Sequence, residues 1–101
     1  MHRYLRLIEV MRQLKVDAEF LRSLEEEDLV HPKRTSEDEV VVSAEDVERM
    51  RLARLLMSEL EVNLAGVEVI MHMRDEMVSM QQQFSEILEA VAEEVRRRSG
   101  R

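Results

Sequence analysis

The chain has 101 residues, enough for one domain but not comfortably for two, and it carries a net charge of −7. Glycine and proline together contribute only three residues and aromatic side chains only 3%, a composition that favours helices. The absence of cysteine excludes disulfides, thiol nucleophiles and thiolate metal ligands, and no apolar run of about 18 residues exists that would span a membrane.

The N-terminal segment, MHRYLRLIEVMRQL, is interrupted by Arg and Glu. It therefore lacks the continuous apolar region of a signal peptide, and we expect a cytoplasmic protein. Its apolar residues lie mostly three or four apart, which predicts a helix from about Leu5 to Leu14. Asp17 is placed to cap a second helix, which ends near Asp28-Leu29 before the break at His31-Pro32. Two short helices joined by a tight turn predict a helix-turn-helix unit.

The next segment contains signals for a β-wing and a third helix. Residues 33–39 are polar and turn-like, and the three β-branched residues Val40-Val41-Val42 follow them, so we expect a short hairpin. Ser43 then begins a capping-box pattern in which Asp46 occupies the third position after the cap. The third helix is expected to run from there to about Leu60.

The last segment predicts a long helix with one apolar side. Asn63 is a candidate cap, and apolar residues then alternate three and four apart in a heptad pattern, while a break near residues 77–81 remains open. A single helix cannot bury such a side, so we expect a homodimer through it. The predicted dimerisation residues are Ile70, Met73, Met77, Met80, Phe84, Ile87 and Val91.

Four short motifs, in this order, resemble those of the MerR superfamily. They are Val16-Asp17 through Phe20-Leu21-Arg22, Leu29-Val30-His31-Pro32, Val42 to Met50, and Leu60 to Val67. The resemblance covers roughly residues 5–98. It implies a mainly α fold with a MerR-like winged helix-turn-helix head over residues 1–69 and a short β-wing. Residues 70–101 would form a C-terminal helical dimerisation stalk, antiparallel in the dimer as in MerR proteins.

Departures from the DNA-binding members point to one branch of that superfamily. Ser23-Leu24 stand where those members carry two tyrosines, residues 35–39 replace their Arg- and Gly-containing wing, and Asp28 replaces a turn glycine. This pattern is similar to the chaperone-modulator family CbpM. The resemblance implies a non-enzymatic protein that inhibits a CbpA/DnaJ-type co-chaperone by occupying its J-domain. The alternative is a MerR-type, heat-shock repressor-like transcription regulator that binds DNA.

The distribution of charge supports a protein partner. Residues 17–46 contain eleven acidic side chains against three basic ones, and such a segment repels phosphates but attracts a basic protein surface. The alternatives are an ordinary solvated face and, for Arg22, Lys33 and Arg34, residual phosphate contacts. Our candidate partner-binding residues are Glu19, Arg22, Glu26, Glu27, Glu37, Asp38 and Glu39, with their acidic neighbours Glu25 and Asp28.

The sequence does not favour catalysis or a cofactor. No Ser/His/Asp arrangement, Gly-rich phosphate loop or isolated carboxylate pair stands out. Met71, Met73, Met77 and Met80 with His72 would suit a soft metal ion, but thioethers at helical spacing are far more often packing residues. We expect no enzyme activity, no metal and no cofactor.

Overall fold

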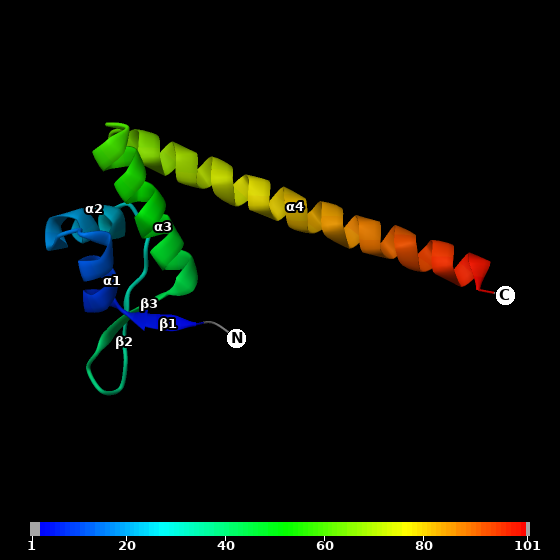
Figure 1. The fold of residues 1–101 in the computed structure, drawn as a ribbon, viewed down its shortest axis with the longest axis horizontal. Coiled ribbons are helices and arrows are strands. Elements are labelled where there is room, and N and C mark those ends of the chain that lie inside the picture. The colour runs from blue at the N-terminus through cyan, green and yellow to red at the C-terminus, as the bar shows by residue number, and fades with distance from the viewer. Residues whose placement is uncertain (1–2, 101) are drawn as a thin grey trace. The chain divides into compact units, whose positions relative to one another are not determined.

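The structure is a computed structural model that describes residues 3–100. Three strands, four α-helices and one π-helix follow each other along the chain. In order they are β1 (Tyr4–Arg6), α1 (Leu7–Leu14), α2 (Ala18–Glu26), β2 (Lys33–Arg34), β3 (Val40–Ser43), α3 (Ala44–Arg54), η1 (Leu55–Glu59) and α4 (Leu64–Ser99). The predicted fold class is confirmed: the protein is mainly helical, with a winged helix-turn-helix and a long C-terminal helix (Figure 1).

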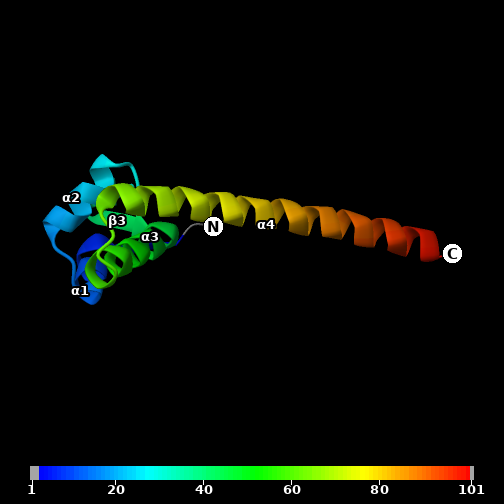
Figure 2. The same cartoon turned by 90° about the horizontal axis from the view of Figure 1, so that it is seen from above.

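The chain divides into two compact units, Met1–Met71 and His72–Arg101. In the first unit α1, α2 and α3 gather around one core, and the views of Figures 1 and 2 agree on this grouping. Strands β1 and β3 contribute to that core together with the helices, whereas both residues of β2 are exposed. Its fully buried side chains include Leu24, Val30, Val42, Met50, Val67 and Met71.

A three-stranded antiparallel sheet in the order β1-β3-β2 closes one side of this unit. The predicted wing is present, since Lys33 pairs with Val41 and Arg34 with Val40. The prediction of a helix from about Leu5 is wrong at its start, because Tyr4–Arg6 is a strand in which Leu5 pairs with Val42. Pairing with a strand about forty residues away is a tertiary effect that helical periodicity does not report.

The predicted helix caps are present. The backbone N–H of Phe20 donates to Asp17 Oδ1 at 2.8 Å, and that of Asp46 donates to Ser43 Oγ at 3.1 Å. The reciprocal half of the capping box differs from the expectation. The Asp46 carboxylate accepts from the backbone N–H of His31 at 2.9 Å, so it joins α3 to the segment after α2.

The fourth helix begins at the predicted cap, where the Gly66 N–H donates to Asn63 Oδ1 at 2.8 Å. It continues to Ser99, so the break that the sequence left open near residues 77–81 is absent. The third helix ends close to the predicted Leu60, but its last five residues, η1, form a π-helix and not an α-helix. Glu61 then adopts a left-handed φ of 56° ahead of α4.

Gly66 gives a first testable prediction, since it lies where a side chain does not fit. A Cβ at this position would lie 2.7 Å from Cγ1 of Val62, a stiff β-branched side chain that packs against the core. Alanine usually stabilises a helix by about 1 kcal/mol over glycine, but crowding of this kind costs roughly 1–3 kcal/mol. We therefore expect Gly66→Ala to lower the free energy of unfolding, measured by urea denaturation.

A double-mutant cycle supplies the control for this prediction. In a Val62→Ala background the crowding atom is gone, so Gly66→Ala should raise the free energy of unfolding, by up to about 1 kcal/mol. Equal effects of Gly66→Ala in both backgrounds would show that Val62 does not set the requirement for glycine.

Candidate functional site

Helix α2 presents most of the predicted partner-binding residues. Leu21 and Leu24 face the core, which turns Glu19, Arg22 and Glu26 outward, and all three are exposed. Glu27 is the exposed C-cap, and Asp28 follows it in a left-handed conformation with φ 61°. Aspartate tolerates this conformation better than most residues, so it replaces glycine in the turn without breaking it. We call this surface the α2 patch; it comprises Glu19, Arg22, Glu25, Glu26, Glu27 and Asp28.

The wing turn between β2 and β3 presents the other predicted residues. The Thr35 N–H donates to the Glu39 carbonyl at 2.8 Å, and the Glu39 N–H donates to Thr35 Oγ1 at 3.2 Å, which closes the turn. We call Glu37, Asp38 and Glu39 the wing acids. In Figure 1 the wing turn and α2 lie on opposite sides of α1, so the predicted residues form two separate surfaces.

Two of the three wing acids form ion pairs within the chain. Arg34 contacts Asp38 at 3.0 Å, and Arg6 contacts Glu39 at 3.2 Å. Glu37 and the carboxylates of Glu25, Glu26 and Glu27 have no such pair within the described residues 3–100. The α2 patch therefore has more uncompensated negative charge than the wing.

The two basic residues of strand β2, Lys33 and Arg34, are engaged locally. Arg34 is held by Asp38, while the Lys33 Nζ donates to the Tyr4 hydroxyl at 3.3 Å and lies 5.5 Å from the centre of that ring. Arg22 is the single cation on α2. Such a helix offers a phosphate backbone few cations and many anions.

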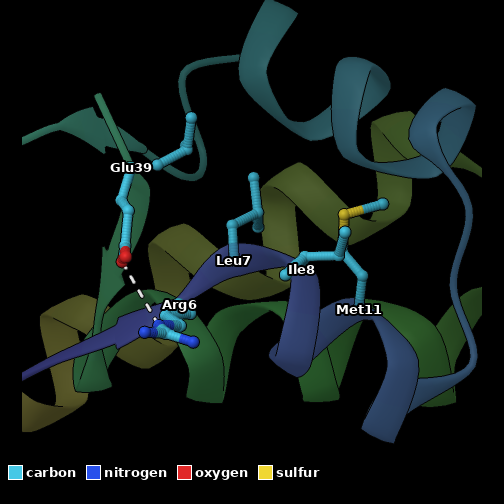
Figure 3. A pocket seen from close by; sticks show the side chains of 6 residues that line it. Arg6, Leu7, Ile8, Met11 and Glu39 are labelled. Carbon is cyan, nitrogen blue, oxygen red and sulfur yellow. Dashed lines mark ion pairs between the residues drawn. The ribbon is translucent and has the colours of Figure 1, made fainter. Parts of the chain in front are cut away.

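Sequence reasoning missed an apolar groove between α1 and the wing. Its volume is about 550 Å³, and Figure 3 shows Leu7, Ile8 and Met11 on α1 facing Glu39 across it. The Arg6–Glu39 ion pair lies at its rim. Ile8 is 68% exposed, although the periodicity of α1 placed it among the apolar residues of the helix. The lining residues are Arg6, Leu7, Ile8, Met11, Glu39 and Val40.

The predicted dimerisation residues divide at the start of the second unit. Ile70 packs against the core of the first unit and Met71 is buried within it. The other six have exposures between 54% and 67%, and Leu88 and Val95 are exposed beside them. We call these six the α4 stripe; they are Met73, Met77, Met80, Phe84, Ile87 and Val91.

Two structural features bear on metals and membranes. Over residues 3–100, no group of three or more His, Cys, Asp or Glu side chains is arranged to hold a metal ion. Met71 lies in the core and so is separated from the exposed methionines that follow it. Within the same residues, no helix combines the length and apolarity needed to cross a membrane.

Comparison with known proteins identifies the family. No curated protein matches the chain. The family model for the MerR HTH family regulatory protein matches residues 5–89, which includes both helices of the helix-turn-helix, the wing and most of α4. The chain therefore belongs to the MerR HTH family of regulatory proteins.

Proposed function

We propose that the chain is a non-enzymatic chaperone modulator whose partner is the J-domain of a CbpA/DnaJ-type co-chaperone. The observation that supports this most strongly is the outer face of α2, where Glu19, Glu25 and Glu26 accompany a single cation, Arg22. In a helix-turn-helix protein this second helix ordinarily reads DNA, and here it carries the wrong charge for that role. The J-domain as partner follows from the resemblance to the CbpM family.

The position of the acids along α2 strengthens the argument. The carboxyl end of a helix carries partial negative charge, so acidic residues there are unfavourable by roughly 0.3–1 kcal/mol each. The last turn of α2 contains no basic residue, and Glu25, Glu26 and the C-cap Glu27 lie at that end. These glutamates destabilise their own helix. Such a cost is expected where a surface serves to bind the basic side chains of a partner.

The alternative function is a DNA-binding regulator of heat-shock genes. Membership of the MerR family favours it, as does the pair Lys33-Arg34 on the wing strand β2. A phosphate would have to compete with Asp38 for Arg34, however, and it would approach a wing with three acids. We therefore place the regulator second.

Two binding measurements on the intact chain separate these functions. We expect micromolar or tighter binding to the J-domain of the DnaJ-type protein from the same organism, and no binding to duplex DNA at physiological salt. A sub-micromolar, sequence-selective gel shift would favour the regulator. If the chain binds no J-domain of the organism, it is not a chaperone modulator of this kind.

Charge reversal within the α2 patch should weaken J-domain binding. In the variant Glu26→Lys with Glu27→Lys, two attractive contacts of roughly 0.5–1 kcal/mol each become repulsive, so we expect affinity to fall at least tenfold. The loss should arise mainly from slower association, and the salt dependence of binding should flatten. Calorimetry at two salt concentrations, with circular dichroism for the fold, measures both effects.

A matched variant controls for total charge. Glu86→Lys with Glu93→Lys makes the same change in net charge on exposed positions of α4, away from the α4 stripe. It should bind the J-domain nearly as the wild type does. If both double variants lose affinity equally, the overall charge of the protein governs binding and the α2 patch has no specific part in it.

A further inference from the structure

The groove between α1 and the wing has an apolar lining, and one of its side chains, Ile8, has no place in the core. Helix α1 turns Leu7 and Val10 into the core, whereas Ile8 remains 68% exposed on its outer side. Leu7, Met11 and Val40 complete the apolar lining beside it. A contiguous apolar surface of this kind on a small domain is typical of an interaction site.

The groove has the size for side chains of a partner. Its volume of about 550 Å³ lies within the usual range of ligand pockets, and exceeds what one leucine or phenylalanine side chain fills. Its lining includes Ile8, which is 68% exposed on α1, so a protein segment that lies across this side of α1 can reach it. An amphipathic helix provides such a segment, because side chains three or four positions apart project from one face.

The rim of the groove selects the charge of that segment. Arg6 lies 3.2 Å from Glu39 and 3.7 Å from Glu9, so one guanidinium serves two carboxylates. Glu37 lies two residues from Glu39 on the same turn and has no ion pair within residues 3–100. Arg6 and Glu39 are the charged residues of the lining, and their charges offset each other. The negative charge beside the groove comes from Glu9, which contacts Arg6, and from Glu37 on the wing turn, and it complements lysine or arginine side chains that flank an apolar anchor.

We propose that this groove receives the apolar side chains of a basic amphipathic helix, whose cations pair with Glu9, Glu37 and Glu39. The proposal rests on the proposed function in one respect, since it takes that helix to belong to the J-domain. It adds that the apolar anchor of the interface lies on α1 and the wing, separately from the α2 patch. Ile8 is then the central contact residue, and the Arg6–Glu39 pair lies at the edge of the groove.

The composition of the chain allows a direct test by NMR. It contains three isoleucines, one in each of three places: Ile8 in the groove, Ile70 against the core and Ile87 in the α4 stripe. Isoleucine methyl labelling of the full chain therefore gives one signal for each place. The probe is a synthetic helical peptide with leucines on one face and lysines on the other, and the control peptide carries glutamate for lysine.

We expect the basic peptide to shift the Ile8 methyl signal saturably, to leave Ile70 and Ile87 in place, and to bind at least tenfold more tightly than the acidic peptide. Ile8→Ser and Glu39→Gln should each weaken its binding several-fold, measured by fluorescence anisotropy, with circular dichroism confirming the fold. An unmoved Ile8 signal, or a shift confined to Ile87, overturns the proposal.

The J-domain then tests the two claims separately. If it binds the wild type but binds Ile8→Ser equally well, the groove is not the anchor and the proposed function still holds. If it binds neither protein, the proposed function fails, and the peptide measurements decide whether the groove accepts basic helices. Loss of J-domain binding in Ile8→Ser, with Ile8 shifted in the wild type, supports both claims.

Discussion

Replacing Asp46 with alanine should lower the free energy of unfolding by about 2–4 kcal/mol, because this carboxylate is buried and connects two parts of the fold. Asp46 is 4% exposed. It accepts a hydrogen bond from the His31 backbone N–H at 2.9 Å and lies 3.7 Å from the Arg49 guanidinium. Alanine would leave the His31 N–H without its acceptor in a partly buried place. Urea denaturation followed by circular dichroism measures the loss.

Two further variants separate the hydrogen bond from the charge. Asp46→Asn keeps an oxygen acceptor for His31 and removes the charge beside Arg49, so we expect a smaller loss of about 1–2 kcal/mol. Glu48→Ala, on the same helix, removes an exposed pair with Arg51 at the same i,i+3 spacing, and it should cost less than about 1 kcal/mol. An Asp46→Ala variant as stable as Glu48→Ala would show that the bond to His31 contributes little.

Local signals in the sequence predicted the helix-turn-helix and the starts of α2, α3 and α4, whereas α1 begins two residues later than expected and α2 ends at Glu26, before the expected Asp28-Leu29. Asp17, Ser43 and Asn63 were each identified as helix caps, and each accepts the expected backbone hydrogen bond. A helix cap depends on residues three positions apart, so it can be recognised in the sequence without knowledge of the rest of the fold. The heptad spacing of α4 is equally local, and it predicted the exposed apolar side that the structure shows.

Features that depend on distant residues were missed. Strand β1 exists because Leu5 pairs with Val42, and the partner of Asp46 is His31, fifteen positions away. Adjacent apolar residues pose a related difficulty. Leu7 and Ile8 both fit the pattern of a buried helix face, and only the packing of α1 decides that Ile8 faces outward. The groove therefore has no signal in the sequence.

The sequence predicted which acidic residues form the candidate site, but it did not predict how the fold arranges them. The excess of acids over residues 17–46 is plain in the sequence, yet the fold distributes them over the α2 patch and the wing. The wing acids looked equivalent to the α2 acids. Arg6, distant in sequence, pairs with Glu39, and Arg34 pairs with Asp38, so the two groups differ in the number of acids without an ion pair.

The α4 stripe leads to the prediction with the largest effect on assembly. We propose that a second copy of the chain covers it, because six apolar side chains at heptad spacing, each more than half exposed, have no cover within residues 72–100. Burial of such side chains contributes roughly 1.5–3 kcal/mol each, which is enough to hold a dimer at micromolar concentrations.

Phe84→Glu should convert this dimer to a monomer. Phe84 is 62% exposed in the single chain and lies centrally in the stripe, so the variant would place an unpaired charge in an apolar seam on both protomers, at a cost of several kcal/mol. Gln82→Glu, two residues away on the opposite side of α4, adds the same charge outside the stripe and should remain dimeric. Sedimentation velocity distinguishes the two species. A dimer that persists in Phe84→Glu would place the contact between copies elsewhere on the chain, and a monomeric wild type would mean that the stripe serves a different partner.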